Sequence, residues 1–321
     1  MMNKKDSHTL AVLNPYKSVI RSFVCDEDKV LVGIKNTSAI PNSLMHKLEK
    51  YNYALHTIDK KSSLAGRAVD LDLINPITGH YMSGSSSGTA LNVFLGINDI
   101  GIGNDGGGSV LAPAMCVNIY GFISKLIEKD REINLKPNTD GIVAGNSIGF
   151  MSRDKELLLK TIEYAIDIKK DDDYGIVYSD NKYPGIDSHI IKLENEFLPR
   201  KELTCYLKDV LSKCDVLIKK EGPIDLYGFG DSLFGHYDER TKAIQEQSGK
   251  GYIRVANISG ATCLSIPTKE LGVSILLLCE SKKDKVAKLL KLSEYIEDVH
   301  DELIERYFLD INSYLNDGYQ I

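Results

Sequence analysis

Residues 79–124 read GHYMSGSSSGTALNVFLGINDIGIGNDGGGSVLAPAMCVNIYGFIS and hold the features that decide the fold. Two loops of small residues, Ser83–Thr89 and Gly106–Ser109, are separated by a short predicted helix and a short predicted strand. Glycine loses more conformational entropy on folding than any other residue, so it is kept where unusual dihedral angles or a close backbone approach require it. The concentration of glycine and serine therefore predicts a site at these two loops.

One interpretation of this stretch is a dinucleotide site, because Gly101-Ile-Gly-Asn-Asp-Gly106 matches the pattern GxGxxG. That pattern requires a full strand before it and a helix that opens within it. Here Gly96–Asp99 resembles a turn and leaves little room for the strand, while Pro113 places the start of the next helix near residues 110–113. We therefore disfavour the dinucleotide site. A P-loop is excluded because no Gly-Lys-Ser/Thr follows the glycines.

The run Gly106-Gly107-Gly108-Ser109 favours a hydrolytic serine. The hydroxyl stands at the end of a glycine turn, and the backbone N–H groups of such a turn can form an oxyanion hole. A serine needs a base to become a nucleophile. None of the seven histidines stands in a recognisable motif or metal-binding spacing, which leaves a lysine base as the alternative to Ser-His-Asp.

The two loops resemble those of the amidase signature family, whose motifs are a GGSSGGS loop and a TDTGGSIRxPA loop. They appear here as Ser83–Thr89 and Asn104–Ala114, and Ser109 follows Ser85 by 24 positions, the interval between the two catalytic serines of the family. Four further segments, within a span of about residues 29–297, are similar to family motifs: Leu31–Asn36 to VAVKDN, Asn75-Pro76 to the Asn-Pro before the serine loop, Ser147–Arg153 to TVGPMAR, and Ala256–Pro267 to ANLAGLPALSVP.

The resemblance implies an amidase that cleaves a carboxamide C–N bond of a small molecule or a peptide-like substrate. Ser109 would be the nucleophile that forms an acyl-enzyme, and Lys35 would be the base. Ser85 would relay the proton between them, after a cis peptide bond expected at Gly84–Ser85. Desolvation disfavours the ammonium form of a buried lysine, so Lys35 can be neutral if it is buried.

The resemblance also assigns the oxyanion hole, to the N–H groups of Gly106, Gly107 and Gly108 together with that of Ser109. It implies no cofactor and no metal. We expect Asp105 to hold this loop in place, and Cys116, in an apolar run, to be a core residue.

Two serines of the first loop have a structural interpretation. We expect Ser86 or Ser87 to cap the helix that follows, since serine oxygens accept hydrogen bonds from the N–H groups of a first helical turn.

Departures from the family pattern leave other functions open. Lys35 and Ser85 are closer in sequence than is usual in the family, the arginine of SIR is Leu111, and the chain is shorter than typical members. The alternatives are an acyl or amide transferase that uses the same acyl-enzyme in a biosynthetic pathway, and a catalytically degenerate member that acts as a binding or partner protein.

Composition excludes several other classes of protein. The 321 residues include 43% hydrophobic and 26% charged residues with a formal charge of -6, which is typical of a soluble globular chain and gives no basic surface for nucleic acid or an anionic membrane. No apolar stretch approaches the ~20 residues of a membrane span, and the N-terminus lacks the apolar region of a secretory signal. Six scattered cysteines suit a reducing cytoplasm. The oligomeric state is not determined, and a homodimer stays open.

Strand-like runs alternate with amphipathic helical stretches along the whole chain, which predicts an α/β fold with helices on both faces of a sheet. Strands are expected at Lys29–Ile34, Asn52–Ile58, Cys214–Ile218 and Gly272–Cys279, the last in the middle of its sheet, and helices at Ser86–Leu95 and at residues 154–168, 201–213, 283–297 and 299–312. The resemblance implies a mixed central sheet sandwiched between helices. We predict a single domain over residues 1–321, with a lead-in segment at 1–28 and a C-terminal helix and tail at 298–321.

Overall fold

A computed structural model describes residues 3–64, 67–130, 135, 137, 140–231, 233–298 and 301–315. Its helices and 3-10 turns are α1 (Lys4–Leu13), α2 (Asn42–Glu49), α3 (Ser87–Phe94), α4 (Leu111–Cys116), α5 (Lys155–Ile166), α6 (Arg200–Leu211), η1 (Phe234–His236), α7 (Glu239–Glu246), α8 (Ile253–Ser259), α9 (Lys283–Ser293), α10 (Glu302–Phe308) and η2 (Ile311–Ser313). Its strands are β1 (Val19–Ser22), β2 (Val30–Lys35), β3 (Tyr53–Asp59), β4 (Val69–Ile74), β5 (Tyr81–Ser83), β6 (Ile100–Asp105), β7 (Tyr120–Ser124), β8 (Ser147–Ser152), β9 (Val177–Ser179), β10 (His189–Ile190), β11 (Val216–Glu221), β12 (Ala261–Pro267) and β13 (Ser274–Glu280).

Eleven strands of the described residues form one mixed sheet, in the order β1-β3-β2-β6-β8-β7-β12-β13-β11-β9-β10. The pairs β3–β2, β2–β6, β11–β9 and β9–β10 are parallel, and the other neighbours are antiparallel. Strands β4 and β5 form a separate antiparallel pair. This arrangement confirms the predicted mixed α/β fold.

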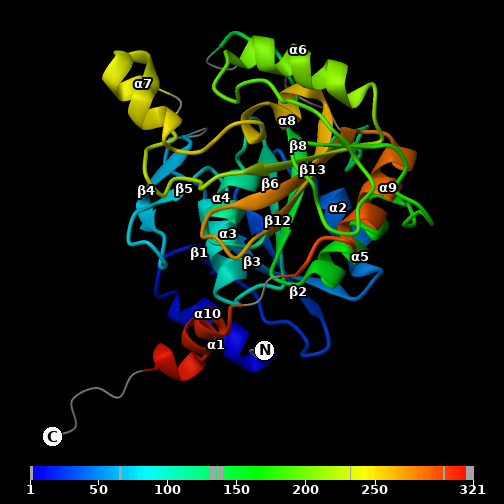
Figure 1. Ribbon diagram of the computed structural model, residues 1–321. Coiled ribbons are helices and arrows are strands. Elements are labelled where there is room, and N and C mark those ends of the chain that lie inside the picture. The colour runs from blue at the N-terminus through cyan, green and yellow to red at the C-terminus, as the bar shows by residue number, and fades with distance from the viewer. Residues whose placement is uncertain are drawn as a thin grey trace, which may run out of the picture.

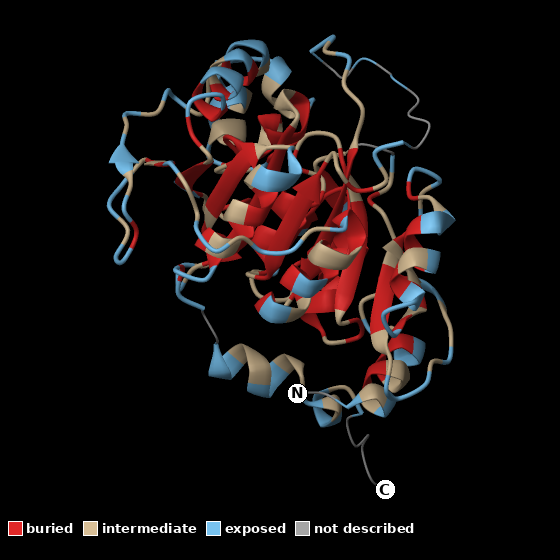
Figure 2. Cartoon of the chain, turned by 90° about the vertical axis from the view of Figure 1, so that its right-hand side faces the viewer, coloured by how far each residue is buried: buried red, intermediate tan, exposed pale blue. Residues whose placement is uncertain are grey.

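Two hydrophobic clusters cover the two faces of the sheet. One contains buried residues of α1, α3, α4, α6 and α8, and the other contains buried residues of α2, α5 and α9, which lie together on one side in Figure 1. Strand β13 contributes to both, because Leu276 and Leu278 enter the first cluster while Leu277 and Cys279 enter the second. A strand that is apolar on both faces must be covered on both, which is why β13 lies between β12 and β11, as predicted. Figure 2 shows the sheet as the buried part of the molecule and the outer helix faces as exposed.

The predicted elements are found with shifts at their ends. The strand expected at Cys214–Ile218 runs over Val216–Glu221, because Cys214 packs into the first cluster and the charged residues that follow Ile218 continue the pairing with β13. The helix expected at 299–312 is shorter: α10 ends at Phe308, and Asp310 caps a separate 3-10 turn. Residues 1–2, 299–300 and 316–321, which include parts of the predicted lead-in and tail, lie outside the described residues.

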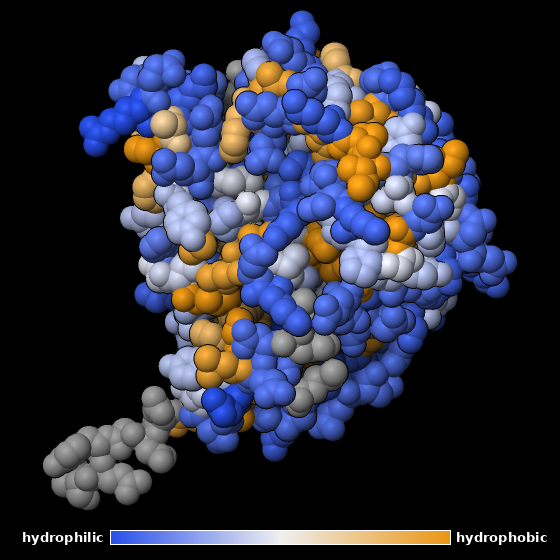
Figure 3. All heavy atoms as spheres, viewed as in Figure 1, coloured by the Kyte–Doolittle hydropathy of each residue, from blue (hydrophilic) through white to orange (hydrophobic). Residues whose placement is uncertain are grey.

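The outer surface differs in character from the interior. Figure 3 shows hydrophilic residues over most of one face, with hydrophobic residues in separate groups between them. Among the described residues, no helix has the length and apolar character needed to cross a membrane.

Candidate active site

Lys35 is the last residue of β2, a strand in the interior of the sheet. Because β2 and β6 are parallel neighbours, their carboxyl ends meet at the same edge of the sheet, where the side chain of Lys35 reaches the carbonyl of Asn104 near the end of β6. Only 3% of Lys35 is exposed. Its Nζ lies 2.7 Å from Ser85 Oγ and 3.5 Å from the carbonyl oxygen of Asn104.

This environment changes the charge of the lysine. Burial lowers the pKa of Lys35 to about 7; the negative charge of Asp105 opposes the shift, and the positive charge of Lys61 adds to it. A substantial fraction of Lys35 is therefore a neutral amine near pH 7, the state that can accept a proton.

Ser85 lies in the loop between β5 and α3, and the peptide bond between Gly84 and Ser85 is cis. Two backbone hydrogen bonds fix this loop: Ser62 N–H donates to the carbonyl of Ser85 at 3.1 Å, and Gly84 N–H donates to the carbonyl of Ala68 at 2.8 Å. A Cβ atom at position 84 would lie 2.4 Å from the carbonyl oxygen of Arg67, so only glycine fits there.

The expectation that Ser86 or Ser87 caps α3 through its side chain is wrong. Ser86 occupies the N-cap position without a side-chain capping bond, and its buried hydroxyl has no partner among the described residues. The hydroxyl of Ser87 donates to Asp70 instead. Ser86 acts through its backbone, because its N–H donates to the carbonyl of Ser109 at 3.1 Å and so joins the two loops.

Ser109 follows the glycine loop at the end of β6 and precedes α4. Asp105 holds this loop: its carboxylate oxygens accept the N–H groups of Gly108 and Val110, each at 2.7 Å. Burial raises the pKa of Asp105, and these backbone N–H groups oppose the shift. The predicted role of Asp105 as the holder of the loop agrees with this geometry.

The same contacts narrow the predicted set of oxyanion donors. The N–H of Gly108 is already engaged by Asp105, and this residue has a φ of +100°, a conformation that favours glycine. Within the described part of the chain, the N–H groups of Gly106, Gly107 and Ser109 donate to no protein acceptor.

The start of α8 supports the glycine loop from behind. The carbonyl oxygen of Arg254 would lie 3.3 Å from a Cβ atom at Gly107, and that of Ile253 would lie 3.5 Å from one at Gly108. Further along α8, the side-chain amide of Asn257 donates to the carbonyl of Gly106 at 3.0 Å. Close packing of α8 therefore determines where this loop can lie.

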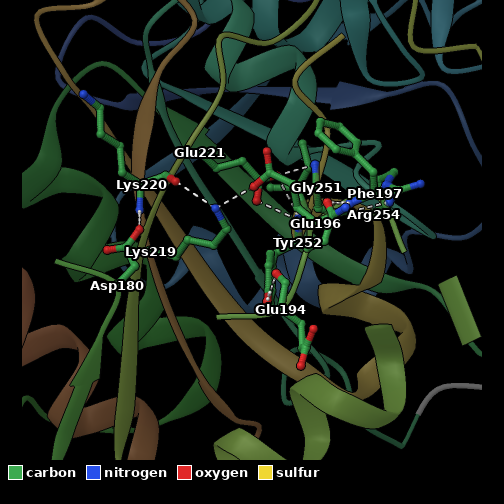
Figure 4. A network of polar contacts seen from close by, with 12 residues as sticks. Asp180, Glu194, Glu196, Phe197, Lys219, Lys220, Glu221, Gly251, Tyr252 and Arg254 are labelled. Atoms are coloured by element: carbon green, nitrogen blue, oxygen red, sulfur yellow. Dashed lines mark hydrogen bonds and ion pairs between the residues drawn. The ribbon is translucent and has the colours of Figure 1, made fainter. Parts of the chain in front are cut away.

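A buried carboxylate in turn fixes the start of α8, as Figure 4 shows. Glu221, at the end of β11, accepts the N–H groups of Gly251, Tyr252 and Ile253 at 2.7–3.1 Å. Lys219 pairs with Glu196 at 2.7 Å in the same network. The acceptor at the amino end of the helix satisfies N–H groups that the helix itself leaves unpaired.

Lys35, Ser85 and Ser109 line one cavity of about 640 Å³, together with Gly106, Gly107 and Gly108. Sequence reasoning missed its cationic residues, Lys61, Arg67, Arg200 and Lys250. These positions are scattered among 39 lysines and arginines, and no motif distinguishes them.

The predicted relay needs two hydrogen bonds, and the structure contains the one between Lys35 Nζ and Ser85 Oγ. Among the described residues, no hydrogen bond joins the hydroxyls of Ser85 and Ser109, so that second link stays a prediction. Burial raises the pKa of the Cys116 thiol to about 11, in agreement with the expected core residue. No group of three or more potential ligands within the described ranges is placed to hold a metal ion, and His300 lies outside those ranges.

The glycines of the GxGxxG match have a packing role. Gly101 and Gly103 lie inside strand β6 rather than in a turn. A Cβ atom at either position would lie 2.6 Å from a side chain at the start of α3, Thr89 or Ser86. Glycine therefore lets α3 approach β6 closely.

Comparison with known proteins gives the same family as the sequence motifs. Residues 73–126, which contain both loops, match the model of the family described as Amidase. This match bears out the resemblance seen in the sequence motifs. No curated protein sequence matches the chain.

Several solved structures share the fold at low sequence identity. A 6-aminohexanoate cyclic dimer hydrolase complexed with substrate is 11% identical, with a TM-score of 0.62 over 90% of this chain and 92% of that one. A glutamyl-tRNA(Gln) amidotransferase subunit from Thermotoga maritima is 13% identical, with a TM-score of 0.60 over 89% and 90%. An allophanate hydrolase variant from Kluyveromyces lactis is 12% identical, with a TM-score of 0.59 over 89% and 69%. These likenesses support the fold and leave the substrate open.

Proposed function

We propose that this chain is an amidohydrolase that cleaves a carboxamide through an acyl-enzyme on Ser109, with Ser85 and Lys35 as its proton relay. The observation that carries the proposal is the buried contact of 2.7 Å between Lys35 Nζ and Ser85 Oγ. It lies in the same cavity as Ser109 and the glycine loop. A buried amine with a lowered pKa beside a hydroxyl is a suitable base for serine chemistry.

In the proposed reaction, Ser109 Oγ attacks the carbonyl carbon of the amide. Its proton passes to Ser85, whose own proton passes to the neutral amine of Lys35. The N–H groups of Gly106, Gly107 and Ser109 hold the negative oxygen of the tetrahedral intermediate. When the C–N bond breaks, the leaving amine takes a proton from Ser85, which Lys35 reprotonates. Water then hydrolyses the ester on Ser109 and releases the carboxylic acid.

We place this activity in a reducing compartment such as the cytoplasm. All six cysteines are free thiols, which supports this placement.

The test is labelling of the purified protein with a fluorophosphonate, read by intact mass and peptide mapping. We expect one adduct, on Ser109. Ser109→Ala should abolish it, while Ser85→Ala and Lys35→Ala should each slow it by about 10²–10⁴-fold, the range typical of lost general acid–base catalysis. Ser43→Ala, at an exposed serine outside the cavity, is the control and should label at the rate of the unmodified chain.

The same protein is then screened with primary amides, anilides, amino-acid amides and peptides. A free carboxylic acid as the product supports hydrolysis, and a new amide formed with an added amine supports the transferase alternative. Labelling that persists at full rate in Ser109→Ala contradicts the proposed nucleophile.

A further inference from the structure

The charges around the cavity are of one sign. Lys61, Arg67, Arg200 and Lys250 line it, and no Asp or Glu is among its lining residues in the described part of the chain. The chain as a whole has a formal charge of -6, so this cluster does not reflect a general excess of basic residues.

Lys250 and Arg200 are each paired with a carboxylate outside the cavity lining. Lys250 Nζ lies 2.6 Å from Asp225, and both side chains are nearly buried. Arg200 lies 2.8 Å from Asp140. Because these ion pairs offset the charges of Lys250 and Arg200, we assign no ligand to these two side chains.

Arg67 and Lys61 differ from this pattern. One terminal nitrogen of Arg67 pairs with Asp231 at 3.0 Å, but its Nε is buried and has no partner among the described residues. Lys61 makes no ion pair or side-chain hydrogen bond with any residue that the structure describes. A buried N–H donor without an acceptor is unfavourable, so the Nε of Arg67 points to an acceptor that the protein does not provide.

Both residues border Ser85. Lys61 precedes Ser62, whose N–H donates to the carbonyl of Ser85, and Arg67 precedes Ala68, whose carbonyl accepts the N–H of Gly84. An anion held by these two side chains would lie next to the serine that exchanges protons in the proposed reaction.

We infer that the substrate is an anionic amide, whose carboxylate is bound by Arg67 and Lys61 beside Ser85. That the substrate is an amide rests on the proposed function. That it carries a negative charge rests on the residues of the cavity alone. Guanidinium and ammonium groups form charge-assisted hydrogen bonds with a carboxylate, which are stronger than neutral ones. The carboxylate can belong to the acyl part or to the amine part of the substrate.

The test measures how well four small amides slow fluorophosphonate labelling of the full chain. N-acetylglycine carries the carboxylate on its amine part, and succinamic acid carries it on its acyl part. N-acetylglycinamide and succinamide are their uncharged counterparts. We expect at least one anion to protect at a concentration about tenfold or more below that of its neutral counterpart, and the pair that shows this ratio identifies the part that carries the charge. Salt should reduce the ratio, since it screens charges.

Two variants and a control assign the effect to residues. Lys61→Gln removes a charge that has no protein partner, and Arg67→Lys retains the pair with Asp231 but removes the Nε donor. Each should lower the ratio of protection by several-fold. Lys269→Gln, at a side chain that is 77% exposed and outside the cavity, should leave the ratio unchanged.

Equal protection by anions and neutral amides, or a preference for anions that survives both variants, overturns the inference. If Ser109 takes up no fluorophosphonate, the proposed function fails, and calorimetric titration of the same four compounds then decides the inference separately. Equal affinities in that titration, or no binding at all, overturn it as well.

Discussion

At the scale of the residue, Lys35 is almost fully buried, and its side chain contacts the hydroxyl of Ser85. Its neighbours on the cavity wall are hydroxyl, amide and cationic groups, and the carboxylate of Asp105 is directed to backbone N–H groups. The negative charge of Asp105 favours the ammonium form of Lys35, but burial outweighs it and lowers the pKa of the lysine to about 7.

The pH dependence of Ser109 labelling should follow the charge of Lys35. Below the pKa of about 7 the lysine is an ammonium and cannot accept a proton, so the rate should fall about tenfold for each unit of pH. Above pH 7 the rate should reach a plateau. In Lys61→Gln the inflection should move to higher pH, because the charge of Lys61 helps to lower the pKa of Lys35. A flat profile between pH 5 and 9 in both proteins contradicts Lys35 as the base.

Replacement of Lys35 by methionine should slow labelling by about 10²–10⁴-fold, as Lys35→Ala does, and raise the melting temperature. The pKa of Lys35 is about 7 in the folded chain and near its ordinary 10.5 in the unfolded chain, so the unfolded chain binds more protons between these values. Stability therefore rises with pH across this window, and the destabilising effect of the lysine is greatest below pH 7. We expect Lys35→Met to gain most in melting temperature near pH 6 and least near pH 10. A lower melting temperature at every pH contradicts this account.

At the scale of the element, two carboxylates fix the geometry of the glycine loop. Asp105 accepts backbone N–H groups of the loop itself. Glu221 accepts N–H groups at the start of α8, which packs against the loop. Loops that make catalytic contacts are held best when the residues around them are themselves hydrogen-bonded. The two carboxylates thus act on the site without touching a substrate.

Glu221→Gln should weaken both the fold and the site. The glutamine has one carbonyl oxygen where the carboxylate has two, and its NH₂ group cannot accept the N–H groups that begin α8. We expect a loss of about 1–3 kcal/mol in the free energy of unfolding, measured by urea denaturation, and slower labelling of Ser109 at temperatures where the protein stays folded. The matched control is Glu270→Gln, whose exposed ion pair with Lys220 should contribute less than about 1 kcal/mol. Equal effects of the two variants contradict the role given to Glu221.

Sequence patterns predict these elements unevenly. The long amphipathic helices and the apolar strands β2 and β13 are predictable because their periodicity is strong. Strands β7 and β8 carry glycine and serine at several positions, so neither alternation nor a continuous apolar run marks them. The site residues Lys35, Ser85 and Ser109 are predictable because they lie in motifs with a fixed interval. Arg67 and Lys61 are not, because only the folding of the loop around Ser85 brings them to the cavity.

At the scale of the whole molecule, the site and the C-terminal region lie against opposite ends of the same buried helix. Ser85 immediately precedes the amino end of α3, whereas Phe94 at its carboxyl end packs against Phe308 of α10, with 5.0 Å between the ring centroids. All eight residues of α3 are buried. Helix α3 is therefore enclosed by the sheet at one side and by the C-terminal segment at its far end.

Phe308→Ala should lower the free energy of unfolding without changing the rate of Ser109 labelling. The substitution removes a partly buried ring from the first hydrophobic cluster, and we expect a loss of about 1–3 kcal/mol in the free energy of unfolding, less than the 3–5 kcal/mol typical of a fully buried phenylalanine. Because Phe308 contacts the end of α3 that is far from Ser85, the rate of fluorophosphonate labelling at a temperature well below the transition should match that of the unmodified chain. Tyr307→Ala is the neighbouring control: Tyr307 is 63% exposed and its ring packs on that of Phe308, so its loss should cost about 0.5–1.5 kcal/mol while the contact of Phe308 with Phe94 is kept. Urea denaturation and labelling rates on the same preparations check both parts. Slower labelling in Phe308→Ala, with Tyr307→Ala unaffected, would mean that the C-terminal helix determines the position of the serine loop through α3, and the separation proposed for the two ends of this helix would be wrong.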